Sequence, residues 1–185
     1  AYQKMAWSKM IFNEDIASYK FYMLELVKHG EELVDDDKQA QKESKGNNIP
    51  DPTLLKARLL YDGGYYEKAH RLLARKAHSY ISNSPYNLEY NYRIGRTAQA
   101  LKNYPDAIKH LSNVINNGRN SEAYFACNAA LQIGKIYESQ KELTRASDYY
   151  NLCLDLEPSD YKNSLHQKAK SGIARIKQLE KMRSF

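Results

Sequence analysis

The sequence predicts an all-α fold: an α–α superhelix of repeated helical hairpins with a C-terminal capping helix. Two observations predict this fold. Small residues recur at spacings of 38 and 39 residues, and the apolar side chains around them follow helical spacing. A third observation excludes the main competitor, because 8 Gly and 5 Pro in 185 residues are too few for a turn-dense β-sandwich or barrel.

The repeat is defined by two positions for small residues, twelve residues apart, which we call the small slots. A small side chain at each slot lets the two helices of a hairpin approach one another closely. Seven residues fill these slots: Ala57, Gly95, Gly134 and Gly172 the first slot, and Ala69, Ala107 and Ala146 the second. Breakers such as Asp62-Gly63-Gly64 lie between the two slots and predict the turn inside each hairpin.

The N-terminal part of the chain is expected to be less regular. Residues 1–34 predict a degenerate helical hairpin, because their apolar residues keep only an uneven helical spacing. Asn13-Glu14-Asp15 fits a turn and N-cap between its two helices. Residues 35–50 are polar and end in Lys45-Gly46-Asn47-Asn48, which predicts a linker with at most a short helix.

The rest of the chain is expected to divide into three hairpins and a cap. The small slots predict repeats over residues 51–84, 85–121 and 122–159, followed by a solitary helix over residues 160–185. That helix carries a single apolar stripe among many charged residues: Leu165, Ala169, Gly172, Ile173, Ile176 and Leu179. Such a pattern is typical of a helix that caps the end of a repeat array.

At these positions the chain resembles the tetratricopeptide repeat (TPR) family, whose order of small and aromatic positions it shares. The third repeat carries the fullest match: Gly134, Tyr137, Ala146, Tyr150 and Pro158. Two features depart from the family. Its tryptophan position is filled by Thr53, Asn91 and Ala130, and the period exceeds the usual ~34 residues. We expect the extra residues in the turns at 79–85 and 117–121. The resemblance implies a superhelix whose first helices line a concave groove that binds a peptide or partner protein.

The chain also resembles the C-terminal part of longer bacterial proteins with such repeats, through Leu55-Lys56-Ala57-Arg58-Leu59-Leu60 and Tyr161-Lys162-Asn163-Ser164. We therefore expect a segment cut from a longer polypeptide. Two cysteines fit the cytoplasm and do not exclude a periplasm, so localisation stays open. No stretch approaches the roughly 18 apolar residues that a membrane-spanning helix needs.

The sequence carries no motif that predicts catalysis. The five histidines are scattered, and none belongs to a His-Glu-x-x-His zinc signature. A nucleophile elbow, a phosphate loop and a dinucleotide fingerprint are also absent. We therefore expect a protein that is not an enzyme and that binds no cofactor or metal.

Charge predicts the chemistry of a partner. Residues 53–120 carry 11 basic and 4 acidic side chains, whereas residues 30–52 carry 3 and 7, within a chain of net charge +6. The basic middle repeats favour an acidic peptide or protein as the partner, with nucleic acid as the alternative. A solvated helical surface with an excess of lysine explains the same counts without any partner.

The repeat also predicts which residues face the groove. The residue after each first small slot is a cation, namely Arg58, Arg96 and Lys135, and an apolar or aromatic residue lies one turn earlier, at Leu54, Tyr92 and Leu131. The predicted partner-binding set comprises seven residues: Arg58, Tyr61, Tyr92, Arg96, Gln99, Leu131 and Lys135. The competing interpretation is that the cations pair with Asp62 or Glu138 on their own helices.

The two cysteines, Cys127 and Cys153, are predicted to be neighbours near the open end of the third hairpin. Both could be packed as small buried hydrophobes. A disulfide or reactive pair is the alternative, which requires a specific geometry.

Overall fold

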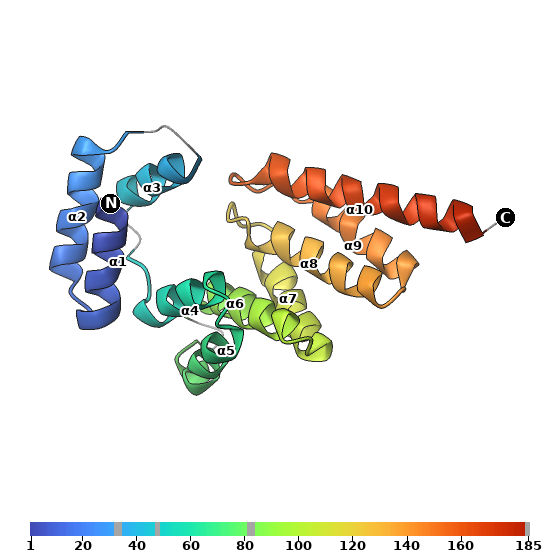
Figure 1. The fold of residues 1–185 in the computed structure, drawn as a ribbon, viewed down its shortest axis with the longest axis horizontal. Helices are drawn as coiled ribbons and strands as arrows, with labels where there is room; N and C mark the ends of the chain where they lie inside the picture. Colours follow the sequence, from blue (N-terminus) through green and yellow to red (C-terminus); the bar gives the residue numbers. More distant parts are fainter. Residues whose placement is uncertain (32–34, 47–48, 81–83, 184–185) are drawn as a thin grey trace. The chain divides into compact units, whose positions relative to one another are not determined.

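The computed structural model describes residues 1–31, 35–46, 49–80 and 84–183 (Figure 1). Within these residues the chain forms ten α-helices, one short 3₁₀ helix and no strand, so the predicted all-α fold is confirmed. The chain divides into two compact units, Ala1–Leu59 and Leu60–Phe185, and the boundary falls inside helix α4. We call them the first and the second unit.

The first unit contains three helices and the start of a fourth: α1 (Tyr2–Asn13), α2 (Ile16–His29), α3 (Asp35–Lys45) and the first part of α4 (Pro52–Asp62). Helices α1 and α2 form a hairpin, and α3 packs against α2. The predicted N-cap between α1 and α2 is confirmed, since the Asp15 carboxylate accepts the N–H of Ser18 at 2.9 Å. Their core is built from small and large apolar side chains on all four helices: Ala6, Trp7, Met10, Tyr19, Met23, Leu26, Ala40 and Leu55.

The segment 35–50, for which the sequence predicts a linker with at most a short helix, contains the eleven-residue helix α3. Ala40 and Gln41 are buried, and the Gln41 amide donates to the carbonyls of Leu26 and Gly30 at 3.0 Å each. A Cβ at Gly30 would lie 2.5 Å from the Gln41 amide nitrogen, so this contact needs glycine. Residues 47–48 of the predicted linker lie outside the described residues.

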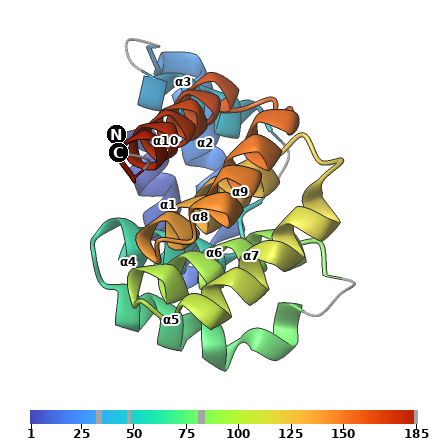
Figure 2. The same ribbon diagram turned by 90° about the vertical axis from the view of Figure 1, so that its right-hand side faces the viewer.

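The second unit continues with helices joined by short connections: α5 (Tyr66–Arg75), the 3₁₀ helix Ala77–Tyr80, α6 (Asn87–Ala100), α7 (Tyr104–Gly118), α8 (Phe125–Ser139), α9 (Leu143–Asp155) and α10 (Lys162–Arg183). From α5 onward each α-helix packs against the next one in the chain. In addition α6 contacts α8, and α8 contacts α10. Figure 2 shows these three helices in one row, with α7 and α9 in a row beside them. The first helices of successive hairpins therefore share one side of the unit, as expected of a helical repeat.

One residue with a left-handed backbone lies in the turn inside each hairpin. The residue in the three successive turns is Gly64 (φ 79°), Lys102 (φ 61°) and Lys141 (φ 65°). These positions have the same spacings of 38 and 39 residues as the second small slot. In all three turns the next residue donates its N–H to the carbonyl five residues earlier, at 2.8 to 3.0 Å. The same residue accepts the N–H of the slot alanine at 3.0 Å. The repeat is therefore present in the backbone hydrogen bonds as well as in the sequence.

The small slots lie where helices come closest. All three second-slot alanines are fully buried. A Cβ at Gly95 would meet Leu111 of α7 at 2.9 Å, and a Cβ at Gly134 would meet the Tyr150 ring at 2.7 Å. A Cβ at Gly172 of α10 would meet the other side of the same ring at 2.4 Å. One tyrosine thus fills the space between α8 and α10, and both neighbouring helices need glycine there.

Helix α10 closes the repeat array through both apolar and polar contacts. Leu165, Ala169 and Ile176 are buried against the core that runs through α7, α8 and α9. Arg175 donates two hydrogen bonds of 2.9 Å to the Glu138 carboxylate on α8. Across the part of the chain that the structure describes, no helix has the length and apolar character needed to cross a membrane.

Candidate partner-binding surface

One cation of the second unit, Lys135, interacts electrostatically with three others, so that four cations from three helices form a group. They are Arg96 of α6, Lys135 of α8, and Lys168 and Arg175 of α10, and we call them the cationic cluster. Partial burial lowers the pKa of Lys135, and the charges of Arg96, Lys168 and Arg175 lower it further. Four like charges are therefore gathered on the side of the unit where the first helices of the hairpins follow one another.

Arg96 is the most constrained member of the cationic cluster. Its guanidinium donates to the Tyr92 hydroxyl at 2.9 Å and to the Tyr61 hydroxyl at 2.7 Å, and it lies 5.0 Å from the centre of the Tyr61 ring. Its Nε is buried and makes no hydrogen bond. Burial opposes the charge, but the two tyrosine hydroxyls outweigh it and raise the pKa of Arg96. The guanidinium is thus held in place by neutral groups, which leave its charge uncancelled.

A row of polar side chains extends from Arg96 across α6 to α8. The Tyr92 hydroxyl also accepts the amide of Asn128 at 2.8 Å, and the Asn128 carbonyl accepts the amide of Gln132 at 2.8 Å. Gln99 donates to the backbone carbonyl of Gln132 at 3.3 Å. Burial raises the pKa of Tyr92 to about 12, against the opposing effect of Arg96, so its hydroxyl stays neutral. This network fixes the orientation of the polar groups between the two helices.

Glu138 is the acidic side chain that faces the cationic cluster on α8. It accepts hydrogen bonds from Arg175 and from the Tyr150 hydroxyl, and the contact with Arg175 is the main reason that the pKa of Glu138 is lowered. Glu138 therefore neutralises Arg175. Lys135 and Lys168 form no salt bridge among the residues that the structure describes, although the charge of Glu138 also acts on Lys135. The cluster keeps a net positive charge.

The structure separates the predicted partner-binding residues into three groups. Tyr61, Arg96, Gln99 and Lys135 belong to the polar surface described above. Arg58 belongs to the first unit, where its guanidinium lies over the Trp7 ring at 5.1 Å from the ring centre.

The third group corrects the prediction of an apolar row facing the groove. Leu131 is 1% exposed and Tyr92 is 5% exposed, so both side chains pack in the core. Leu54, at the equivalent position of the first repeat, is fully buried as well. These residues lie one turn before a cation on the same helix, but the neighbouring helices cover them. Only the Tyr92 hydroxyl reaches the polar surface, through Arg96 and Asn128.

Sequence reasoning missed the cations of α10 and the amides of α8. Lys168 and Arg175 flank the first-slot residue Gly172 at positions −4 and +3, so all three lie on one face of the helix. This spacing could have indicated that both cations lie on the face of α10 that contains the first small slot. Nothing comparable marks Asn128 or Gln132, whose role depends on the neighbouring Tyr92.

The two cysteines lie side by side, as predicted. Their sulfur atoms are 3.5 Å apart, both residues are buried, and both are free thiols. The Cys127 thiol is also 3.4 Å from the carbonyl oxygen of Cys153. They pack between α8 and α9 within the core of the third hairpin. Among the described residues, no three His, Cys, Asp or Glu side chains are grouped so that they could hold a metal ion.

The chain matches no protein-family model, no curated protein and no solved structure. The interpretation of the cationic cluster therefore rests on its own geometry and charge.

Proposed function

We propose that this chain is a protein-interaction module of the TPR type, and that its second unit binds an acidic segment of a partner protein across α6, α8 and α10. The observation that carries the proposal is the pair Lys135 and Lys168, two cations that form no salt bridge within the described residues and lie in a group whose single carboxylate, Glu138, is bound by Arg175. The charges of Arg96, Lys168 and Arg175 repel that of Lys135, so a partner that supplies carboxylates would relieve the repulsion.

The proposed role is binding and not catalysis. The polar groups of this surface are cations and amides held by tyrosine hydroxyls and by one another. Such groups recognise carboxylates through charge-assisted hydrogen bonds. An extended segment that crosses the three helices would meet Arg96, Lys135 and Lys168 in turn, and the uncancelled charge of Arg96 would attract its carboxylates.

The burial of the Tyr92 ring beside Arg96 argues against nucleic acid as the partner. Binding of single-stranded nucleic acid uses exposed aromatic rings on which bases stack. Tyr92, the aromatic residue of the predicted set that lies on α6, is only 5% exposed, and Tyr124 and Phe125 pack against its ring. The Tyr92 ring therefore offers no face on which a base could stack, which favours carboxylates over bases at this position.

A charge-reversal experiment tests this proposal. The probe is a fluorescent glutamate-rich peptide of about twelve residues, with a glutamine-substituted copy as its reference and single-stranded DNA as a second probe. Fluorescence anisotropy should show binding of the glutamate peptide that weakens as salt rises. The double variant Lys135→Glu with Lys168→Glu should weaken it about tenfold or more.

The matched control is Lys170→Glu with Lys177→Glu, two exposed lysines of α10 that lie on the other face of the helix from Lys168. This variant has the same net charge as the double variant and should bind the peptide like the parent. Equal weakening by both variants would show that only total charge matters and would overturn the site. Tighter binding of DNA than of the glutamate peptide would replace the proposal with the nucleic-acid alternative.

A further inference from the structure

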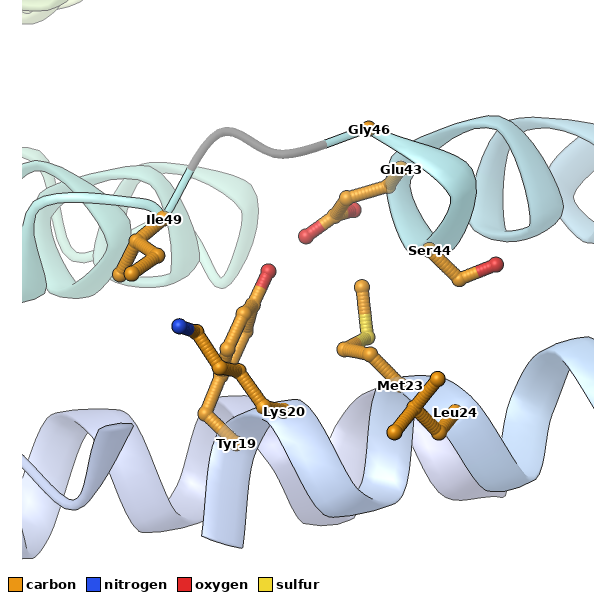
Figure 3. A pocket seen from close by; sticks show the side chains of 8 residues that line it. All are labelled: Tyr19, Lys20, Met23, Leu24, Glu43, Ser44, Gly46 and Ile49. Atoms are coloured by element: carbon orange, nitrogen blue, oxygen red, sulfur yellow. The ribbon is translucent and has the colours of Figure 1, made fainter. Parts of the chain in front are cut away.

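The first unit contains a cavity between α2 and α3 that the proposed function does not use (Figure 3). It encloses about 370 Å³ and is partly open to solvent. This volume is at the small end of the range for ligand pockets. Its walls combine polar and apolar side chains, of which six matter here: Tyr19, Lys20, Met23, Leu24, Glu43 and Ile49.

Tyr19 contributes a buried hydroxyl without a hydrogen bond. The residue is 4% exposed, and its hydroxyl oxygen is inaccessible and has no hydrogen-bond partner. Figure 3 shows this hydroxyl pointing into the space that separates α2 from α3, toward the Glu43 carboxylate. Burial raises the pKa of Tyr19, and the charge of Glu43 and the approach of the hydroxyl to its carboxylate raise it further, so the phenol is neutral. A buried hydroxyl is unfavourable without a partner, which makes it the polar group that an occupant would satisfy.

Glu43 contributes a carboxylate that is already held in place. One of its oxygens accepts the side-chain amide of Gln3 at 2.7 Å, and the other accepts the indole N–H of Trp7 at 2.8 Å. A carboxylate oxygen can accept more than one hydrogen bond, so both keep accepting capacity. The polar end of the cavity thus presents hydrogen-bond acceptors from Tyr19 and Glu43. The negative charge comes from Glu43 alone.

The apolar part of the cavity lining comes from Met23, Leu24 and Ile49. We infer that this cavity binds a primary ammonium group carried on a short apolar body. The ammonium group has three donors, so it can donate to the Tyr19 oxygen and to Glu43 together, while the body packs against the apolar wall. Figure 3 shows the Lys20 ammonium group beside Tyr19, on the side of Ile49, so an occupant's ammonium group would lie on the Glu43 side of the Tyr19 hydroxyl.

The test is a titration of the full chain, labelled with ¹⁵N, with n-butylammonium followed by NMR. n-Butanol and butyrate, which have the same length but no ammonium group, are the reference compounds. Saturable shifts centred on α2 and α3 are expected for n-butylammonium only. A capped lysine amide separates the two sources of an ammonium group: tighter binding than n-butylammonium indicates a side chain of a partner protein, and weaker binding indicates a small free amine.

Tyr19→Phe is the decisive variant, because it removes the unpaired hydroxyl and keeps the ring in the core. It should melt like the parent or above it, and it should bind n-butylammonium about tenfold more weakly. Ser44→Ala is the control on the cavity wall, since Ser44 also lines the cavity but its hydroxyl already donates to the Gln41 carbonyl at 2.7 Å, so its removal should leave binding of n-butylammonium unchanged. Equal binding of n-butanol, unchanged binding by Tyr19→Phe, or no saturable shift at all would each overturn the inference. These variants lie in the first unit, so their failure leaves the proposal for the second unit standing.

Discussion

The two units of this chain are stabilised in different ways. In the second unit, the same turn hydrogen bonds occur three times, at residues 64, 102 and 141, and each is followed by a buried slot alanine. In the first unit, two polar side chains of α3 hold the two helices of the hairpin: Gln41 binds the end of α2, and Glu43 binds two residues of α1. The second unit repeats one pattern of backbone hydrogen bonds, whereas the first unit depends on hydrogen bonds from individual side chains.

The helix starts show the same contrast. The Asp15 carboxylate accepts the N–H of Ser18, and hydrogen bonds with the side chain and then the N–H of Ser18 lower the pKa of Asp15. The second helices of the three hairpins, α5, α7 and α9, start without any side-chain cap. Their starts are defined by the left-handed turn residue and the close packing of the slot alanine. A side-chain cap such as Asp15 defines where one helix begins, whereas a small slot sets how closely two helices pack.

The largest effect should come from filling a small slot. Gly134→Leu should lower the free energy of unfolding by about 1–3 kcal/mol, because the new side chain must displace the buried Tyr150 ring. Thermal or denaturant unfolding measures the change. Ala174→Leu on the exposed face of α10 is the matched control and should leave stability unchanged. If both variants unfold like the parent, close helix packing does not stabilise the repeat.

A smaller effect is expected from the first unit. Gln41→Leu keeps the side-chain volume but leaves the carbonyls of Leu26 and Gly30 without the amide donor, which should cost about 1–2 kcal/mol. Amide hydrogen exchange should accelerate in α2 and α3 and stay the same in α6 to α9. Faster exchange throughout the chain would show that the units unfold together, and the contrast between them would be lost.

The turn residues should give effects of opposite sign. Lys141→Gly removes the strain of a left-handed backbone at a residue with a side chain and should stabilise by about 1 kcal/mol. Gly64→Ala introduces that strain and should destabilise by a similar amount, since no atom lies within 4 Å of the added Cβ to cause a clash. Denaturant midpoints measure both. Two changes of the same sign would contradict the equivalence of these turns.

The smallest effect is the pH dependence of the cap. The pKa of Glu138 is lowered in the folded state, chiefly by the hydrogen bond from Arg175, so this contact stabilises fully only above the ordinary carboxyl value of 4.5. As the pH falls below that value, the stabilisation should disappear. Glu138→Gln should therefore flatten the loss of stability between neutral and acid pH, as measured by unfolding at several pH values. A parallel profile for parent and variant would show that the pair contributes nothing.

Both the success and the errors of the sequence analysis have physical causes. The small slots were readable because a hairpin repeat must place a small residue wherever its helices touch, which leaves a fixed period. Helix α3 was partly missed, since a polar helix that buries little more than Ala40 and Gln41 lacks an apolar stripe. Leu131 was misplaced for another reason: a groove position and a core position can lie one turn apart on the same helix.

By itself the sequence determined the helices, the turns between them and the period of the repeat, because these depend on local backbone preferences and on residue volume at single positions. Only the tertiary structure decided which side chains meet. Arg96, Lys135 and Lys168 come from three helices, and their common charge exists only once α6, α8 and α10 pack in a row. In the first unit, the unpaired Tyr19 hydroxyl faces Glu43 only because α3 folds onto α2. Contacts between distant residues depend on the packing of whole helices, which no short stretch of sequence encodes.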